Sequence, residues 1–306
     1  LADEIGREPR QLSLVGGSWR AIARLDMERG KYPLHVLHEY RMTPAGLRAT
    51  LKWIAASDLK KLRARTGISQ GRMALVPEAA AVLEQMIRTF EPTGIAMSGY
   101  GLREGLLYEQ MPDQIRRRDP LIEACHFAEA RDGRRPGFGV VLDQFIAPVF
   151  AGESTATRRL IKAACLLHDV TWRAHPDFRA EVCFDNATRA NLGGLNHHER
   201  IWLGLALMHR YKKNRDATKF SHLIELLDQT DIRSAEIVGR AMRFGSMFSG
   251  AAPGDVATLK WRPDKAQLSL SLTRQGADLY GEVAAARFKS LAKALGAVAL
   301  VKVTKP

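Results

Sequence analysis

Two short glycine-containing turns could bind a ligand through the backbone. In each, a short apolar run leads into glycine and then into helical periodicity: LSLVGGSWRAIARL and IAMSGYGLREGLL. Glycine lets a ligand approach the backbone, and a following helix offers free N–H groups and a positive dipole end. Arg20 and Arg103 come early in the two helices, where they could meet an anion. The pair favours phosphate or nucleotide binding over tight turns without a ligand, although neither turn matches a Walker loop or a dinucleotide fingerprint.

A histidine–aspartate pair, His168 and Asp169, lies within KAACLLHDVTWRAH. In a helical bundle such a pair is typical of metal-dependent phosphohydrolases, where further histidines complete the metal site. The other histidines available as ligands are His126, His175, His197, His198 and His209. A structural histidine on a partly buried helix explains the pair equally well, so both interpretations stay open.

Other kinds of site are not indicated by the sequence. No Ser-His-Asp or Cys-His arrangement is legible, and no isolated carboxylate pair suggests an acid/base couple. Cys125, Cys165 and Cys183 are odd in number and form no CxxC pair, which disfavours a disulfide framework and a cysteine zinc site. No apolar run is long enough to span a bilayer, and the charged N-terminus LADEIGREPR is not a secretory signal. We therefore expect a cytoplasmic protein without a membrane partner.

The 306 residues carry a net charge of +13, with 46 Lys and Arg against 33 Asp and Glu. The excess is +3 in residues 1–113 and +10 in residues 114–306. The densest basic clusters are at residues 116–118, 131–135 and 210–219. They indicate either solvated helix faces or a surface for a polyanion such as polyphosphate, a nucleotide, nucleic acid or an anionic membrane.

The elements that would position these residues change in type along the chain. Residues 1–112 are predicted to alternate strands and helices, with strands at residues 11–15 and 95–97. One helix is predicted over residues 19–27, and three more are predicted to begin at Thr43-Pro44, at Pro77 and at Leu102. Residues 113–252 are predicted to be nearly all helical. Residues 253–306 are predicted as a small ββαβ module, with strands 256–261, 267–272 and 298–303 and a helix over 282–295. The fold class is therefore α/β followed by all-α, with a small α+β module at the C-terminal end.

Four segments of the first part together resemble the exopolyphosphatase / guanosine pentaphosphate phosphohydrolase family. They are VGGSWRAIARL, YPLHVLHEYRM, PEAAAVLEQMI and SGYGLREGLLYEQM, and their order and spacing match. LLHDVTWRAH and GRAMRFGSMFSG are similar to the HD-type helical domain that follows the phosphatase domains. The resemblance covers roughly residues 10–250, and residues 253–306 look like the C-terminal module of longer members.

The resemblance implies an actin-like core of two ribonuclease-H-like domains with the active site between them. Residues 1–112 would be the C-terminal part of the second such domain, residues 113–252 an HD-like domain and residues 253–306 the ββαβ module. Its activity would be release of terminal phosphate from inorganic polyphosphate, or of the 5′-phosphate from guanosine pentaphosphate, with Mg²⁺ and in a homodimer. A glutamate base would activate the attacking water, while metal and backbone amides neutralise the developing charge.

Carried over residue by residue, the resemblance places two groups of residues on the second-domain side of that cleft. The glycine turn is matched by Gly16, Gly17, Ser18 and Arg20, and the closing box by Ser98, Gly99, Gly101, Arg103 and Glu104. The family's Asp-Ile-Gly-Ser loop, its second phosphate loop and its glutamate base have no match in this sequence, so we expect them upstream of Leu1. We therefore expect Leu1 to be a cut edge and these residues alone to be inactive.

Two other functions remain as alternatives. The first is an HD-type metal-dependent nucleotide phosphohydrolase with His168 and Asp169 as ligands. However, residues 178–181 lack the further histidine of relatives, which favours a structural, chain-guiding or dimerisation role for this part. The second is a non-catalytic polyanion-binding module. Most of the net charge lies C-terminal to the closing box that contains GLREG (residues 101–105), where a long anionic chain would be guided toward the cleft. We therefore expect polyphosphate rather than nucleic acid as the partner.

Overall fold

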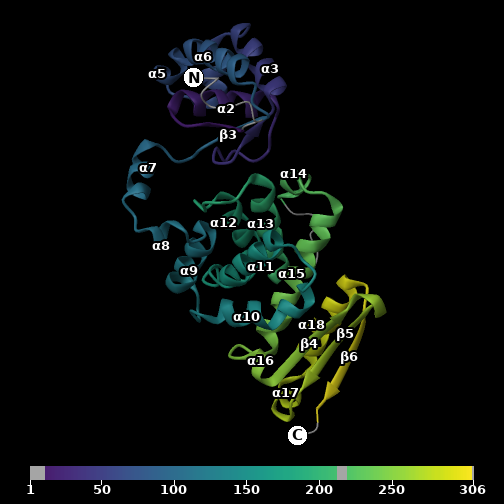
Figure 1. The fold of residues 1–306 in the computed structure, drawn as a ribbon. Helices are drawn as coiled ribbons and strands as arrows, with labels where there is room; N and C mark the ends of the chain where they lie inside the picture. The colour runs from purple at the N-terminus through teal and green to yellow at the C-terminus, as the bar shows by residue number, and fades with distance from the viewer. Residues whose placement is uncertain (1–10, 212–218, 305–306) are drawn as a thin grey trace. The chain divides into compact units, whose positions relative to one another are not determined.

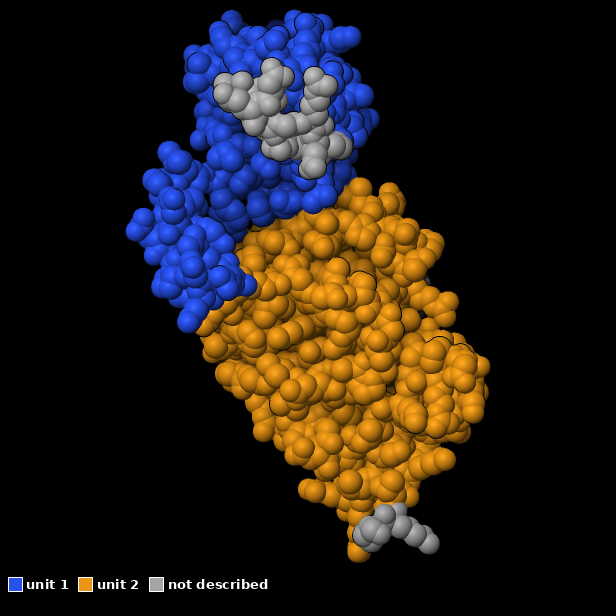
Figure 2. All heavy atoms as spheres, in the orientation of Figure 1, with its two compact units in different colours: residues 1–117 blue, residues 118–306 orange. Residues whose placement is uncertain are grey.

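The computed structural model describes residues 11–211 and 219–304 (Figure 1). The chain divides into two compact units, residues 1–117 and residues 118–306 (Figure 2). The protein combines many helices with two small three-stranded sheets, one in each unit. Among the described residues, no helix has both the length and the apolar character needed to cross a membrane.

The sheet of the first unit has the order β1-β3-β2. β1 (Gln11–Leu14) runs parallel to β3 (Gly94–Met97), and β2 (Arg41–Met42) pairs antiparallel to β3. In the parallel pair Leu14 lies opposite Met97, so both strands end at the same edge of the sheet. The chain segments that follow β1 and β3 therefore leave from neighbouring positions.

Five helices build the core of the first unit around this sheet. They are α2 (Gly17–Arg29), α3 (Pro44–Ala55), α4 (Leu59–Thr66), α5 (Gln70–Ala74) and α6 (Val76–Phe90). α3 begins as predicted, because the Thr43 hydroxyl accepts the N–H of Gly46 at 3.0 Å and Pro44 occupies the first turn. Leu83 and Ile87 of α6 are fully buried against residues such as Ile22 of α2. Two further helices follow, α7 (Leu102–Glu109) and α8 (Asp113–Arg116).

A buried polar network fixes α2 in this core. Asp26 of α2 accepts hydrogen bonds from the Tyr40 hydroxyl, at 2.7 Å, and from the Thr50 hydroxyl of α3. Arg29 donates through Nε to the same Thr50 oxygen at 2.7 Å. Because burial and the hydrogen bond to Asp26 both disfavour the phenolate, the pKa of Tyr40 is raised far above its usual value. The network holds α2 in place relative to α3 and thereby positions the first glycine turn.

The second unit begins with a set of packed helices. These are α9 (Pro120–Asp132), α10 (Phe138–Ile146), η1 (Ala147–Phe150), α11 (Thr155–Leu167), α12 (Arg179–Arg189), α13 (His197–Tyr211), α14 (Ser221–Ile224), α15 (Gln229–Phe248) and α16 (Pro253–Val256). α13 is buried almost all round, which is expected of a helix at the centre of a bundle. The nearly all-helical character predicted for this part of the chain is confirmed.

The C-terminal sheet packs into the same compact unit. β4 (Ala257–Arg262) and β5 (Gln267–Leu272) form an antiparallel hairpin joined by η2 (Pro263–Lys265), and β6 (Val298–Val303) runs parallel to β5. α17 (Arg274–Leu279) and α18 (Glu282–Leu295) connect β5 to β6. The Phe288 ring of α18 lies 5.2 Å from the Phe244 ring of α15. The predicted ββαβ elements are confirmed apart from the additional short α17, whereas the predicted three-domain division stays a prediction.

Candidate functional site

The two glycine turns lie side by side at the carboxyl edge of the first sheet. β1 leads through Gly16 into α2, and β3 leads through Ser98–Gly101 into α7. The backbone N–H of Ser98 donates to the carbonyl of Leu14 at 2.9 Å, which ties the two turns together beyond the last strand pair. In α/β sheets this edge of neighbouring parallel strands is where ligands usually bind.

The first turn exposes the beginning of α2. Gly16 has φ +129°, a backbone conformation that residues with a Cβ rarely adopt, and it lets the chain turn directly from strand to helix. The first intrahelical hydrogen bond runs from Arg20 N to Gly16 O at 3.1 Å. No side chain of the described residues caps the helix, so the N–H groups of residues 17–19 at its start have no intrahelical acceptor. This arrangement suits a phosphate oxygen.

The second turn is shaped by a close approach between Gly99 and His38. A Cβ at Gly99 would lie 2.9 Å from the Cβ of His38, so only glycine fits there without movement. The Gly99 N–H donates to His38 Nδ1 at 3.1 Å, and the His38 ring packs edge-on against Tyr100 at 4.8 Å. The Ser98 hydroxyl accepts a hydrogen bond from the N–H of Tyr100 at 3.1 Å, and this bond stabilises the turn that Ser98 begins.

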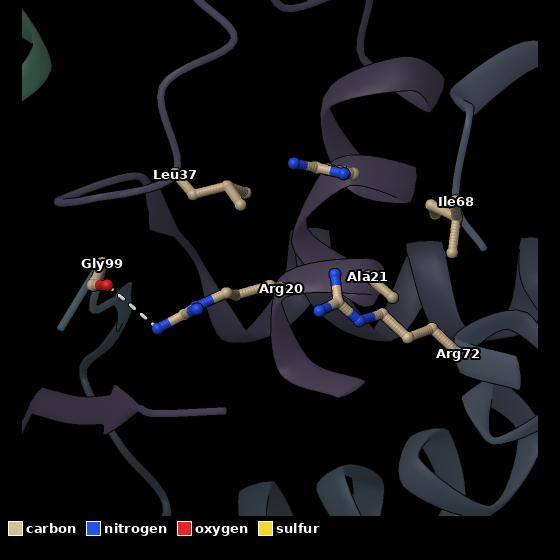
Figure 3. A pocket seen from close by; sticks show the side chains of 7 residues that line it. Arg20, Ala21, Leu37, Ile68, Arg72 and Gly99 are labelled. Atoms are coloured by element: carbon tan, nitrogen blue, oxygen red, sulfur yellow. Dashed lines mark hydrogen bonds between the residues drawn. The ribbon is translucent and has the colours of Figure 1, made fainter. Parts of the chain in front are cut away.

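Arg20 connects the two turns. Its Nη2 donates to the Gly99 carbonyl at 2.9 Å, while its buried Nε has no hydrogen-bond partner among the described residues (Figure 3). Beside it lies a pocket of about 180 Å³, far more than the ~30 Å³ that one water occupies in the liquid. The pocket is lined by Arg20, Ala21, Arg24, Leu37, Ile68, Arg72 and Gly99. Three arginines without a lining carboxylate make this an electropositive site suited to an anion.

Gly16, Gly17 and Ser18 line a second, more open hollow of about 340 Å³. Its other lining residues are Trp19, Leu75, Glu78, Ala79 and Val82. Trp19 is half-buried, whereas Leu75 and Val82 are exposed apolar side chains. The beginning of α2 is therefore flanked by a basic pocket and by a largely apolar hollow.

Four of the predicted residues, Ser98, Gly101, Arg103 and Glu104, line neither of these two hollows. Glu104 Oε2 accepts the N–H of Gly101 at 2.7 Å and so completes the cap of α7. This backbone hydrogen bond lowers the pKa of the Glu104 carboxyl from its usual value. Arg103 is exposed on α7. The structure thus brings Arg20 together with Gly99, and gives Gly101 and Glu104 a capping role.

Three residues of the site were not predicted from the sequence. Arg24 lies one helical turn after Arg20 on α2, so the helical period alone could have indicated it. Arg72 reaches the pocket from α5, and His38 reaches Gly99 from the segment before β2. No sequence signal links these two to the glycine turns, because the folding of separate elements brings them there.

The histidine–aspartate pair of the second unit is held by an arginine. Arg134 donates from Nε and Nη2 to the two carboxylate oxygens of Asp169, both at 2.7 Å. His168 follows the last residue of α11, and its Nδ1 lies 2.8 Å from the Cys165 carbonyl, which requires that nitrogen to carry the proton. The Tyr211 hydroxyl donates to the His168 carbonyl at 3.0 Å.

The protonation of this pair follows from its burial. Burial lowers the pKa of His168 to about 4, and the nearby positive charge of Arg210 adds to that effect. Burial opposes ionisation of Asp169, but the hydrogen bonds from Arg134 outweigh it and the pKa of Asp169 is lowered. The pair is therefore a neutral imidazole beside an ionised carboxylate that already has a cationic partner.

These residues do not fit a metal centre. In residues 11–211 and 219–304 no group of three or more His, Cys, Asp or Glu side chains is arranged to hold a metal ion. The guanidinium of Arg134 engages both oxygens of Asp169, and the Nε2 of His198 lies 2.7 Å from Asp231 rather than near His168. His168 and Asp169 therefore lack, among the described residues, the further ligands that a metal centre at this pair would need.

The comparison with known families agrees with the two-part organisation of the chain. Residues 1–114 match the model of the Ppx/GppA phosphatase family, and residues 142–301 match the model of the exopolyphosphatase C-terminal region. The chain belongs to the Ppx/GppA phosphatase family, which places it among the phosphatases, a class of hydrolases. No curated protein matches it in sequence.

Proposed function

We propose that this chain supplies the phosphate-binding side of a cleft in which the terminal phosphate of inorganic polyphosphate is released by hydrolysis. The observation that carries the proposal is the hydrogen bond from Arg20 to the Gly99 carbonyl, which places a guanidinium between the two glycine turns. The match to a family of phosphatases supports the reaction class. The three arginines of the pocket support an anionic substrate with several phosphates.

The chain's own residues would act on the charge of the phosphate. Phosphoryl transfer needs little beyond positioning and neutralisation of the oxygens that carry charge in the transition state. The N–H groups at the start of α2 would bind phosphate oxygens, and Arg20, Arg24 and Arg72 would hold the neighbouring phosphates. Mg²⁺, when bound, would neutralise further phosphate charge. Glu104 is occupied in the cap of α7, so we do not assign it as the base that activates water.

A second candidate substrate is favoured by the apolar hollow beside Gly16. Trp19, Leu75 and Val82 offer surface on which a nucleobase could lie while its phosphates reach the start of α2. Guanosine pentaphosphate, losing its 5′-phosphate, would use both hollows, whereas polyphosphate needs only the basic one. A Trp19→Ala variant should weaken binding of a guanosine nucleotide and leave tripolyphosphate binding unchanged, which isothermal titration can measure.

Phosphate release from long-chain polyphosphate in the presence of Mg²⁺ tests the catalytic part of the proposal. We propose that the 306 residues alone do not turn polyphosphate over, because none of them is assigned as the base. Turnover at the rate of an ordinary enzyme would contradict this, and a described carboxylate such as Glu78 would then be the first candidate for the base. Metal analysis is the control for the HD alternative, since a transition metal retained by the wild type and lost on His168→Ala would favour that alternative.

A further inference from the structure

Four arginines of the second unit converge between three helices. They are Arg210 of α13, Arg240 and Arg243 of α15, and Arg287 of α18. A small hollow between these helices is lined by His209, Arg240, Arg243, Arg287 and Ser290. We call these four arginines, with Ser290, the arginine seam. It belongs to one compact unit and shares no residue with the glycine turns.

The positive charge of the seam is only partly compensated. Arg240 forms an ion pair with Glu236 and donates to the Ser290 carbonyl at 3.4 Å. The side chains of Arg243 and Arg287 form no ion pair or hydrogen bond within the described residues, and their Nε atoms are buried without a partner. Arg210 is only 7% exposed and its Nε has no hydrogen-bond partner in the same part of the chain, but the negative charge of Asp169 offsets part of its positive charge. Buried donors without acceptors are rare in folded proteins and destabilise them.

The electrostatics of the seam show the same imbalance. Burial lowers the pKa of Arg243 to about 10, and the neighbouring Arg287, Arg210 and Arg240 lower it further in the same direction. Burial also lowers the pKa of Arg210. Like charges brought this close repel one another, and an anion in the hollow would reduce the repulsion and accept hydrogen bonds from the arginines that line it.

The contact between α15 and α18 includes apolar side chains as well as these arginines. α15 and α18 already contact each other through Phe244 and Phe288, both fully buried. Arginines at the same junction therefore add charge to a contact that apolar side chains hold. Their guanidinium groups present planar forks of N–H donors, which fit phosphate oxygens better than any other anion-binding side chain.

We propose that the arginine seam binds a phosphoryl group, either as free inorganic phosphate or as the end of a longer phosphate chain. The enclosed space is about 10 Å³, room for one oxygen-sized atom. One phosphate oxygen would enter between Arg243 and Arg287, and the others would stay at the mouth, near Arg240 and Ser290. The site is distinct from the glycine turns, so it does not depend on the function proposed for them.

Titration calorimetry with inorganic phosphate and with tripolyphosphate, at constant ionic strength, tests the seam. Arg243→Gln removes one positive charge from it, and Arg274→Gln removes the same charge from an exposed position on α17. We expect Arg243→Gln to weaken binding at this site by about tenfold or more, and Arg274→Gln to leave it within about twofold of the wild type. Hydrogen exchange locates the effect: ligand should protect α15 and α18 in the wild type and in Arg274→Gln, but not in Arg243→Gln.

The two ligands distinguish the source of the phosphoryl group. Protection of α15 and α18 by both ligands supports a site for free phosphate, and protection by tripolyphosphate alone supports a site for the end of a chain. Protection by neither ligand, or the same protection in Arg243→Gln as in the wild type, would overturn the proposal. Arg287→Gln repeats the test if Arg243→Gln does not fold. Without ligand, either variant should melt at or above the wild-type temperature because repulsion is relieved, whereas a purely structural role would lower the melting temperature.

Discussion

Arginines in this chain fall into two kinds according to what their guanidinium groups contact. Those in the basic clusters that the sequence singles out mostly have acidic partners: Arg116 pairs with Asp113, Arg118 with Glu123 and Arg131 with Asp132. Most of those that line the pockets, such as Arg20 and Arg243, form no ion pair among the described residues, although Arg240 pairs with Glu236. Clustering in the sequence therefore indicated mostly solvated ion pairs, and apart from Arg210 the anion-binding candidates come from arginines that are dispersed along the chain. Of the predicted cluster at 210–219, residues 212–218 lie outside the described residues.

At the same scale, the pair formed by Arg134 and Asp169 should stabilise the second unit. The Asp169 side chain is 8% exposed and that of Arg134 is 51% exposed, so solvent screens the pair on one side. We expect Arg134→Ala to lower the free energy of unfolding by about 2 kcal/mol, less than for a fully buried pair, because it leaves the Asp169 charge uncompensated. Urea unfolding measures this. Arg118→Ala, which breaks an exposed pair with Glu123, is the matched control and should cost about 0.5 kcal/mol or less.

The buried imidazole of His168 gives stability a defined pH dependence. Its folded pKa of about 4 lies below the usual 6.5, so between these values the unfolded chain binds a proton that the folded chain does not. Stability is therefore fully present above pH 6.5 and falls as the pH decreases toward 4, by roughly 3 kcal/mol for this group. The lowered pKa of Asp169 adds a further loss at still lower pH. Urea midpoints from pH 7 to 4 should fall less steeply in His168→Gln; an equally steep fall would contradict the assignment.

Among the elements, the start of α2 matters most to the proposed function, and Gly16 controls it. At φ +129° a side chain is strained whatever the space around it, so we expect Gly16→Ala to destabilise the first unit by about 1–3 kcal/mol. The same change should weaken tripolyphosphate binding, because the N–H groups of the first turn would shift. Gly71→Ala in α5 is the control, since a Cβ there meets open space in a helix and should be neutral or stabilising. Equal effects of the two changes, in melting and in titration, would contradict this role.

Elements with a strong apolar pattern could be predicted from the sequence, and weakly patterned ones could not. Strands β1, β3, β4, β5 and β6 and helices α2, α3, α6 and α18 lie within a few residues of their predicted positions. α4 was missed because LKKLRART buries a single leucine, Leu62. β2 is two residues long and exists through its pairing with β3, which no local pattern reveals. The residues brought together from separate elements, Arg72 in the pocket and Arg287 in the seam, were missed for the same reason.

On the scale of the whole molecule, each of the two units holds a basic pocket whose lining, within the described part of the chain, includes no carboxylate. The net charge of +13 predicted an anionic partner but did not say where it binds. Membership of the Ppx/GppA phosphatase family is consistent with this positive charge, because a phosphatase must bind negatively charged phosphate groups. The arginine seam lies in the part of the chain that carries most of the excess charge.

The central claim is that the glycine turns joined by Arg20 bind the phosphates of the substrate, and titration of tripolyphosphate into Arg20→Gln tests it most directly. Hydrogen exchange at α2 assigns the measured binding to the turns rather than to the arginine seam. Lys61→Gln, an equal loss of charge at an exposed position of α4, is the control. The account predicts that Arg20→Gln weakens binding at the turns by about tenfold or more, while Lys61→Gln stays within about twofold of the wild type. Equal affinity and equal protection of α2 in Arg20→Gln and Lys61→Gln would contradict it.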